Sequence, residues 1–497
     1  MTQNLSTTAL PEEVQQGHYS RDKLRPRIVH LGFGAFHRAH QALVLDRLLE
    51  SEQECDWGYC EVNLFGGEQL IRDLRAQDHR YSVMEMGAEQ NTTRIIGSVC
   101  ASLHPALDGS EAILEQLASA QTAIVSMTIT EKGYCLSSET HKLDTANPLI
   151  VSDLEHPGSP QSAVGYIVES LRRRRERALG GFTLMSCDNL PQNGVLTRQM
   201  VLDYAAKLDT KLAGWIDKEV SFPSTMVDRI VPAITEESLE RLTEALGVND
   251  PCGIACEPFL QWVIEDRFVA GRPQWEKAGA QLVENVLPFE EMKLRMLNGS
   301  HSFLAYLGYL GGYQTIAETM TDSSYKDAAY HLMLNEQAPT LTLPEGVSSR
   351  DYADRLIERY SNPALKHRTW QIAMDGSQKL PQRMLESVQC HLERGTEYPC
   401  LALGIAGWMF YVSGRDELGQ PIDVRDPLAA ELKTICDRCG RDAIVVRELV
   451  KLSGVFPATL ASNAEFIQAI TESYQQLLER GARGAIAQLI SHKEGAL

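Results

Sequence analysis

The sequence carries no excess of positive charge. Its 47 Lys and Arg residues stand against 66 Asp and Glu residues, which gives a formal net charge of −19 at pH 7. This balance argues against nucleic acid or an anionic membrane surface as a partner, because both attract basic proteins. It does not exclude an anionic small molecule, since a site inside an acidic protein can be locally positive.

Long hydrophobic runs are also missing. The longest, from about Cys400 to Val412, is shorter than the roughly 20 residues that a membrane-spanning helix needs. The first residues, Met1 to Ser6, contain neither a basic nor an apolar stretch and do not resemble a secretion signal. The 11 cysteines are odd in number and scattered through apolar surroundings, as in a reducing compartment. We therefore expect a cytoplasmic protein.

Clusters of Cys and His with the spacing of a zinc site are absent as well. Cys436 and Cys439 form a Cys-x2-Cys pair, but no second pair of ligands accompanies it in the sequence. Chance spacing on a helix is the expected explanation, so the sequence predicts no metal site.

What the sequence does contain is the composition of a soluble globular protein, with 43% hydrophobic and 23% charged residues. A chain of 497 residues exceeds one ordinary core, so two domains are expected. In the first half, β-rich runs alternate with helical stretches, which predicts a mostly parallel sheet with helices on both faces. The runs are 27–32, 57–65, 81–86, 94–100, 122–130 and 181–187, and the helices lie near 34–50, 67–77, 109–119, 162–179, 197–217 and 235–246.

From about residue 287 onward, helical periodicity replaces the alternation, and Pro and Gly separate the helices. The expected helices are 288–310, 326–335, 349–360, 366–392, 400–412, 427–437, 441–453 and 463–491. No low-complexity linker separates the halves, so we expect a packed interface between domains 1–286 and 287–497, and ligand sites favour such interfaces. We find no internal repeat.

A glycine-containing turn follows the first β-rich run, Arg27–Leu31, and precedes an amphipathic helix. Strand, Gly-x-Gly turn and helix in this order are typical of a dinucleotide site. Gly32 allows the tight turn, Gly34 lets the backbone approach a pyrophosphate, and the helix start offers N–H groups to the anion. His37 stands where the usual third glycine would be. The predicted fold is thus α/β, a Rossmann-type doubly wound sheet followed by an all-α domain.

The cofactor is expected at the carboxyl ends of the strands, where Thr130 and Asn189 also fall. From the glycine turn, the expected cofactor-binding residues are Leu31, Gly32, Phe33, Gly34, Ala35, Phe36, His37 and Arg38. Glu131, next to Thr130, is expected to join them.

A second informative stretch is Lys293-Leu-Arg-Met-Leu-Asn298-Gly-Ser-His301, in an otherwise apolar, helix-forming segment. At about 100° per residue, Lys293 and Asn298 would lie about 140° apart with His301 between them. A lysine against apolar surface has its ammonium destabilised, so that it can exchange a proton with an alcohol. Asn298 can donate to an alkoxide, and His301 can orient a hydroxyl. The alternative is a surface lysine, a helix-ending Asn-Gly and a satisfied core histidine.

The two stretches together resemble the mannitol dehydrogenase family, the polyol-specific long-chain dehydrogenases. The likeness runs from about residue 25 to the end, through the blocks Gly32–His40, Thr128–Tyr134, Ser186–Asn189, Met226–Arg229, Glu257–Trp262, Lys293–His301 and Asp375–Lys379. Within the family, Cys60–Leu64, Leu297–Tyr309 and His367–Lys379 are similar to the fructuronate reductase subgroup.

The resemblance implies hydride transfer with NAD and catalysis without a metal. Lys293 would be the base in oxidation and the acid in carbonyl reduction. Asn189 and Asn298 would flank the reacting oxygen, and His301 would bind and orient the substrate. Lys379 is similar to a family position that contacts the far end of the substrate.

Several further residues carry two interpretations. Asp228 and Arg229 either face nicotinamide or substrate or form an ordinary surface ion pair. Lys379 and then Arg368 are candidates for binding a substrate carboxylate, with Arg383 and His367 as further cations, although each also fits a solvated helix face. Glu61 or Asn63 would favour NAD over NADP if either reaches the adenosine ribose.

The predicted activity is NAD-dependent interconversion of D-fructuronate and D-mannonate. The alternatives are a polyol dehydrogenase acting on mannitol, arabinitol or sorbitol, and a tagaturonate reductase. A dinucleotide-binding regulatory protein is a non-enzymatic alternative. The set of Lys293, Asn189, Asn298 and His301 argues against it, because a sensor needs no proton-transfer lysine. The expected partner is a small sugar acid or polyol, with no nucleic acid or membrane, and the chain would be a monomer or small homo-oligomer.

Overall fold

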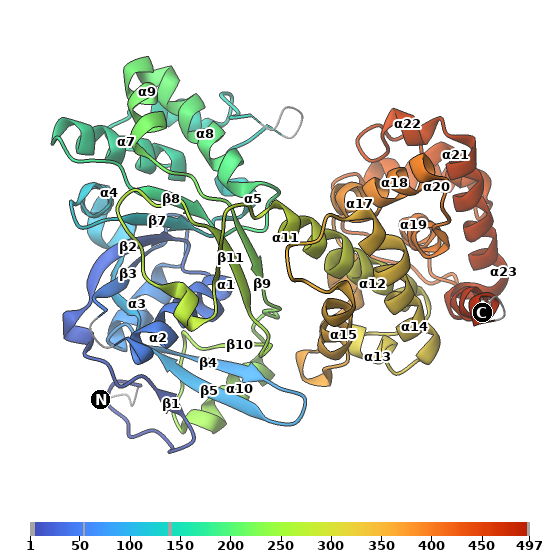
Figure 1. Ribbon diagram of the computed structural model, residues 1–497, viewed down its shortest axis with the longest axis horizontal. Coiled ribbons are helices and arrows are strands. Elements are labelled where there is room, and N and C mark those ends of the chain that lie inside the picture. Colours follow the sequence, from blue (N-terminus) through green and yellow to red (C-terminus); the bar gives the residue numbers. More distant parts are fainter. Residues whose placement is uncertain (1–4, 53–54, 138–141, 495–497) are drawn as a thin grey trace. The chain divides into compact units, whose positions relative to one another are not determined.

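The computed structural model describes residues 5–52, 55–137 and 142–494, and Figure 1 shows the course of the chain. Two compact units divide it, Met1–Leu287 and Pro288–Leu497. The domain boundary predicted from the sequence falls between residues 286 and 287. Residues 1–4 lie outside the described residues. They form most of the segment, Met1 to Ser6, that does not resemble a secretion signal.

Unit 1 is built around a five-stranded parallel sheet in the order β6-β3-β2-β7-β8. Its strands are β2 (Arg25–Leu31), β3 (Trp57–Val62), β6 (Val99–Leu103), β7 (Ile124–Met127) and β8 (Thr183–Ser186). The strand order reverses beside β2, which is the place where such sheets bind ligands. The helices of unit 1 are α1 (Ala35–Ala39), α2 (Gln41–Ser51), α3 (Glu68–Ala76), α4 (Pro105–Ala118), α5 (Thr130–Gly133), α6 (Pro148–Glu155), α7 (Ala163–Glu176), α8 (Asn193–Leu208), α9 (Thr210–Glu219) and α10 (Glu236–Leu246).

Both faces of this sheet are buried, which is why its strands read as continuous apolar runs rather than alternating ones. Ile28 and Tyr59 belong to the core that includes α2 and α3. Val29 and Cys60, one position further along each strand, belong to the core that includes α4, α7 and α8. In Figure 1 these two groups of helices lie on opposite sides of the sheet. The predicted Rossmann-type class is confirmed.

Two smaller sheets complete unit 1, and the sequence did not separate them. One has the order β1-β5-β4-β10 and the other β12-β11-β9. Their strands are β1 (Gln15–Gln16), β4 (Tyr81–Met86), β5 (Asn91–Ile96), β9 (Thr225–Asp228), β10 (Ile254–Cys256), β11 (Gln261–Glu265) and β12 (Gln281–Val283), and the 3-10 turns are η1 (Arg21–Lys23) and η2 (Trp275–Ala278).

The predicted strand 94–100 is in fact two strands, because β5 ends at Ile96 and β6 begins at Val99 in another sheet. Gly97 makes the crossing. Its N–H donates to Asp46 and its carbonyl accepts from Arg21. A side chain at this position would meet the Tyr19 hydroxyl at 2.8 Å. The predicted helix 34–50 is likewise divided, at His40, whose φ of −124° and ψ of −89° are not helical.

Unit 2 is helical, as predicted. Its α-helices are α11 (Leu287–Met292, which starts at the boundary), α12 (Ser300–Leu310), α13 (Ile316–Thr319), α14 (Ser323–His331), α15 (Ser349–Tyr360), α16 (Thr369–Ile372), α17 (Gly376–Leu380), α18 (Glu386–Arg394), α19 (Pro399–Tyr411), α20 (Ala429–Cys439), α21 (Ile444–Leu449), α22 (Ala458–Ala461) and α23 (Ala464–Glu494). Three wider π-helical segments interrupt them, η3 (Lys293–Gly299), η4 (Leu332–Gln337) and η7 (Pro381–Leu385), and two 3-10 turns are η5 (Ala338–Thr340) and η6 (Pro363–Leu365).

The long apolar run of the sequence forms α19, which is buried on every side in the core of unit 2. It packs against α12 and α23, as expected of a helix that is hydrophobic all round. Its N-terminus is satisfied by the Glu336 carboxylate, which accepts the N–H groups of Cys400 and Leu401. Among the described residues, no helix is long and apolar enough to cross a membrane.

Candidate active site

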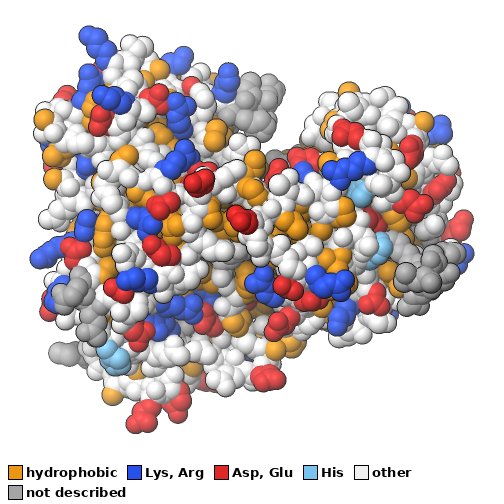
Figure 2. Space-filling model, in the orientation of Figure 1, with side chains coloured by type: hydrophobic (Ala, Val, Ile, Leu, Met, Phe, Trp, Pro, Cys, Tyr) orange, Lys and Arg blue, Asp and Glu red, His pale blue; other side chains and the backbone are white. Residues whose placement is uncertain are grey.

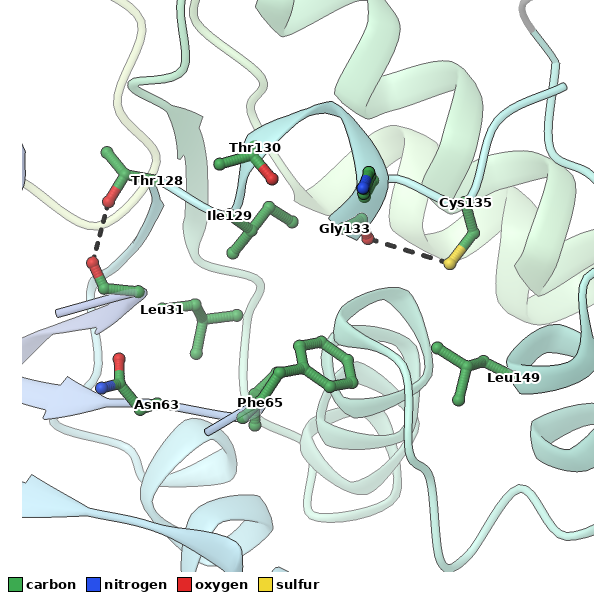
Figure 3. Close-up of a pocket in the computed structure, with 12 residues that line it drawn as sticks. Leu31, Asn63, Phe65, Thr128, Ile129, Thr130, Gly133, Cys135 and Leu149 are labelled. Atoms are coloured by element: carbon green, nitrogen blue, oxygen red, sulfur yellow. Dashed lines mark hydrogen bonds between the residues drawn. The ribbon is translucent and has the colours of Figure 1, made fainter. Parts of the chain in front are cut away.

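A cleft of about 440 Å³ opens at the carboxyl ends of β2, β3 and β7. In Figure 3, Asn63 and Phe65, which follow β3, face Ile129 and Thr130 across it. Of the residues expected to bind the cofactor, Leu31, Gly32, Asn63 and Thr130 line this cleft. The fold thus places the glycine turn at a ready-made ligand site.

Glycine stands at the two positions of the turn for different structural reasons. Gly32 has a φ of +108°, and a Cβ there would lie 2.2 Å from the Thr128 carbonyl oxygen, so the fold itself requires glycine. Gly34 is exposed, and a Cβ there would meet only the Gly32 oxygen, at 3.9 Å. The open space over Gly34 therefore fits the close approach of a pyrophosphate. Asn63 holds the turn by accepting the Phe33 N–H at 2.7 Å.

Four side chains expected to contact the cofactor are instead turned into the unit. Phe33, His37, Arg38 and Glu61 are all buried. His37 bonds to the Glu61 carboxylate at 2.9 Å and stacks on His30 with ring centroids 3.4 Å apart. The prediction that Glu61 reaches a ribose is therefore wrong in this arrangement, because its oxygens face the core. Ala35 and Phe36 are half-buried, and the Phe36 ring stacks on His40.

His30, His37 and Glu61 lie close enough together to suggest a metal site. Both ring nitrogens of His30 are already hydrogen-bonded, Nδ1 to Ser126 at 2.7 Å and Nε2 to Thr128 at 2.9 Å. Parallel stacked rings also direct their lone pairs along separate planes rather than toward one ion. The pKa of His30 is well below its ordinary value because of burial and the neighbouring His37. These groups form a buried hydrogen-bonded support beneath the glycine turn.

The segment after β7 is held by Asp188, which follows β8. Its carboxylate accepts the N–H groups of Ile129 and Thr130 at 3.0 and 2.9 Å and the Tyr134 hydroxyl at 2.8 Å. Burial raises the pKa of Asp188. Thr130 is thereby fixed with a φ of +60°, an uncommon conformation for a residue other than glycine. Asp188 was missed as a functional residue, although it stands inside the block Ser186–Asn189.

Three further expected residues of unit 1 lie at strand ends. Asn189 is exposed directly after Asp188, and Glu131 is exposed next to Thr130. Asp228 is buried at the end of β9.

Arg229 fits neither of the two interpretations offered by the sequence, a residue facing nicotinamide or substrate and a surface ion pair. Its side chain is fully buried, pairs with Glu85, and donates to the carbonyls of Ala39 and Glu257. It is neither a surface ion pair nor open to a substrate.

Unit 2 carries the remaining expected catalytic residues on η3 and α12. The segment Lys293–Gly299 is a π-helix rather than the expected α-helix. Because π-helical hydrogen bonds join residues i and i+5, Lys293 and Asn298 lie above one another on one face and not 140° apart. His301 follows one turn later, and all three side chains are buried. The spacing Lys-x4-Asn thus matches one π turn, a feature that is frequent at functional sites.

The wide turn frees backbone carbonyls, and hydroxyl groups satisfy them. Ser300 donates to the Met296 carbonyl at 2.5 Å, and Tyr360 donates to the Leu297 carbonyl at 2.9 Å. Tyr360 also stacks on His301, with ring centroids 5.1 Å apart. No sequence pattern indicated Tyr360, because it lies on α15, far from the motif.

Three polar atoms in this part of unit 2 are buried without a hydrogen-bond partner. Among the described residues, Asn298 Nδ2, His301 Nε2 and His367 Nδ1 find no hydrogen-bond partner. Such buried groups cost free energy unless a ligand or water satisfies them. These three atoms can therefore exchange hydrogen bonds with a bound molecule that carries hydroxyl groups.

The surroundings of His301 are strongly positive. Burial holds the pKa of His301 well below its ordinary value, so the imidazole is neutral at pH 7. The neighbouring His367 lowers it further, and so do the positive charges of Arg383, Arg359 and Lys379. His367 itself has its pKa lowered to about 4 by burial and then by Lys379. Arg368, in contrast, is exposed and directly precedes α16.

The parallel sheet, its open glycine turn and the cleft above it define unit 1 as the nucleotide-binding domain of a dehydrogenase. Residues 26–277 match the family model of the mannitol dehydrogenase Rossmann domain, and residues 285–478 match that of the mannitol dehydrogenase C-terminal domain. The chain therefore belongs to the mannitol dehydrogenase family. It is an NAD-dependent oxidoreductase that acts on a CH–OH group of a polyol or sugar acid.

Several relatives cover nearly the whole chain. D-mannonate oxidoreductase of Escherichia coli (strain K12) is 57% identical over 96% of this chain and 98% of its own. The uncharacterized oxidoreductase YeiQ of the same organism is 55% identical over 97% and 98%. The solved structure of Pseudomonas fluorescens mannitol 2-dehydrogenase, a ternary complex with NAD and D-mannitol, is 36% identical, with a TM-score of 0.86 and coverage of 97% and 98%.

Proposed function

We propose that the protein reduces D-fructuronate to D-mannonate with NADH and catalyses the reverse oxidation, with Lys293 as the acid and base. The positive surroundings of His301 carry this proposal, because they would attract a sugar acid rather than a neutral polyol. The net charge of −19 makes that concentration of cations notable. On the face of the molecule in Figure 2, acidic and basic side chains are interspersed.

The identity with D-mannonate oxidoreductase supports the same substrate pair. The second relative, with nearly the same identity, has no assigned substrate. Sequence identity alone therefore does not select the substrate, and the chemistry of the site has to be considered.

The reduction needs a hydride on the carbonyl carbon and a proton on its oxygen. Bound NADH supplies the hydride. Lys293, as an ammonium, gives its proton to the oxygen while the carbonyl π bond breaks, and the neutral amine is then reprotonated from solvent. In oxidation the amine removes the hydroxyl proton. Such general acid–base transfer contributes about 10²–10⁴-fold to a rate.

Asn298 and His301 would act on the oxygens of the substrate. The Asn298 Nδ2 amide has no protein partner among the described residues, so it can donate to the oxygen as charge develops there. A neutral His301 can exchange a hydrogen bond with a hydroxyl through Nε2. The role that the resemblance implies for Asn189 remains a prediction, and so does the interpretation that Asp228 faces nicotinamide or substrate; both residues belong to unit 1.

The experiment that tests the proposal compares three substrates under identical conditions. NADH consumption is measured with D-fructuronate, D-tagaturonate and D-fructose. We expect kcat/KM for fructuronate to exceed that for fructose by about 100-fold or more, because a charge-assisted hydrogen bond is worth about 1.5–3 kcal/mol and an unpaired cation costs more. Preference for tagaturonate would change the stereochemical assignment. Preference for fructose would replace the proposal by a polyol dehydrogenase.

A further inference from the structure

Arg383 lies directly behind the face that carries Asn298 and His301. It belongs to the π-helical segment η7, which begins at Pro381, a residue that lacks the N–H of an ordinary helical bond. Its Nη1 donates to the Ser302 hydroxyl at 2.9 Å and to the Asn298 carbonyl at 3.5 Å. The guanidinium is thus anchored to the residue after His301 and to the backbone of Asn298.

The anchoring uses only one of the three guanidinium nitrogens. Within the described part of the chain, Nε and Nη2 of Arg383 donate no hydrogen bond, and no carboxylate forms an ion pair with it. Three other arginines inside the molecule are compensated. Arg94 pairs with Asp46 and Glu50, and Arg229 pairs with Glu85. Arg174, which has no carboxylate, donates to four backbone carbonyls.

Arg383 is half-buried, and a cation held partly out of water without an anion is unfavourable. Burial lowers the pKa of Arg383 to about 10, and only the phenols of Tyr306 and Tyr360 oppose that effect. A bound carboxylate would supply the missing negative charge. A guanidinium with two nitrogens available can also hold a carboxylate through two parallel hydrogen bonds.

We propose that Arg383 binds the carboxylate of the substrate and is the residue by which the enzyme prefers a sugar acid to a neutral sugar. The inference rests on the proposed function, which it deepens by assigning the anion-binding group. Hydroxyl groups of the same substrate would form hydrogen bonds with Asn298 Nδ2, His301 Nε2 and His367 Nδ1. These buried atoms have no hydrogen-bond partner among the described residues.

The two cations favoured by the sequence fit this role less well. The Lys379 ammonium donates to the backbone carbonyls of Met374 at 2.5 Å and Ile372 at 3.4 Å, so it already supports the loop before α17. Arg368 is exposed and precedes α16. Arg383 alone of these three is anchored to the residues that surround the reacting oxygen.

The test uses Arg383→Gln, with Arg368→Gln as a matched control on the same region of unit 2. Activity is measured on fructuronate and fructose, and binding of D-mannonate and D-mannitol to the enzyme–NAD complex is followed by calorimetry. Arg383→Gln should lower kcat/KM for fructuronate by about 100-fold or more, because charge and bidentate geometry are both lost. It should weaken D-mannonate binding while changing the fructose rate less than about 3-fold. Arg368→Gln should leave both substrates nearly unchanged.

Arg383→Lys provides a second variant in case the glutamine protein does not fold, as judged by thermal unfolding and NADH binding. Lysine keeps the charge but cannot form the two parallel hydrogen bonds of a guanidinium. The ratio of fructuronate to fructose activity should therefore fall by about 10-fold. Equal losses on both substrates in Arg383→Gln, or an unchanged ratio in Arg383→Lys, would overturn the inference and leave the proposed function intact. A wild-type enzyme that prefers fructose would instead refute the proposed function itself.

Discussion

Gly32 and Gly34 stand two positions apart in one turn, yet different forces require glycine at each. The fold leaves no room for a side chain at Gly32, where Thr128 is 2.2 Å from a built Cβ. At Gly34 the nearest atom is 3.9 Å away, so only a ligand would exclude a side chain. The two positions therefore separate folding from cofactor binding.

We predict that Gly34→Ala raises the Kd for NADH by about 10-fold or more, a change of about 1.4 kcal/mol. Its thermal unfolding should stay close to wild type, since the new methyl group meets only open space. Gly32→Ala should lower the free energy of unfolding by about 1–3 kcal/mol because of backbone strain and overpacking. Fluorescence titration of NADH and thermal melts measure both effects. A Gly34→Ala protein that binds NADH normally would show that the pyrophosphate does not lie there.

Lys293 is the residue on which the proposed proton transfer depends. Lys293→Met keeps the length and removes the proton, so turnover should fall by about 100-fold or more. NADH binding should persist, because the glycine turn and its cleft belong to unit 1. Steady-state kinetics together with NADH titration measure the two effects. Near-normal turnover would eliminate Lys293 as the acid and base.

At the scale of elements, the three π-helical segments of unit 2 meet around Gly299. A Cβ there would lie 2.7 Å from Gln337 of η4 and 2.8 Å from the Arg383 carbonyl of η7. Gln337 in turn donates to that carbonyl at 2.9 Å and accepts from Ser387. The close approach places Arg383 beside Asn298, so the packing of these segments builds the substrate side of unit 2.

Gly299→Ala should therefore destabilise the protein by about 1–3 kcal/mol through overpacking and lower turnover at the same time. Gly214→Ala is the matched control, since Gly214 lies within α9 and a Cβ there meets nothing within 4 Å. That control should be neutral or more stable by up to about 1 kcal/mol, because alanine favours a helix. Chemical denaturation measures both variants. Equal stability of the two would mean that the junction around Gly299 is loosely packed.

At the scale of the whole molecule, buried histidines make stability depend on pH. Burial lowers the pKa of His40 to about 3 and that of His79 to about 4, whereas an unfolded histidine titrates near 6.5. Below about pH 6.5 these histidines therefore bind protons in the unfolded chain but stay unprotonated in the folded state. Stability present above that pH is lost as the pH falls, by up to about 1.4 kcal/mol per pH unit for each such group.

We predict that the melting temperature is highest at or above about pH 7 and declines between about pH 6.5 and 4. His79→Asn should make the decline shallower, because the contribution of one histidine to the pH dependence is removed. Asparagine suits the positive φ of 55° at this position. Melts of both proteins across this range measure the difference. Parallel declines would indicate that His79 does not contribute.

The absence of a zinc pattern in the sequence leads to a prediction for the whole enzyme. Prolonged dialysis against a strong chelator should leave activity intact, because a lysine is expected to carry the proton transfer. Metal analysis of the dialysed protein accompanies the assay. Activity that is lost and then restored by added zinc would contradict the proposed mechanism.

Local patterns in the sequence determined the class of fold. Apolar runs bounded by turns and helices predicted β2, β3 and β7, and Gly32 after β2 indicated the nucleotide site, because these features depend on neighbouring residues alone. Local spacing also singled out Lys293, Asn298 and His301. Periodicity could not show that Lys293 and Asn298 share a π turn. That turn depends on hydrogen bonds from Ser300 and from Tyr360 of another helix.

The tertiary structure decided which polar side chains face a ligand and which face the core. Glu61 meets His37, 24 residues away, and Arg229 meets Ala39, 190 residues away. Arg383 contacts Ser302, 81 residues away. Burial and pairing arise between segments distant in the chain, so no local pattern distinguishes these three residues. Only the folded chain shows that Glu61 and Arg229 face the core, and that the hydrogen bonds that Arg383 makes among the described residues all use Nη1.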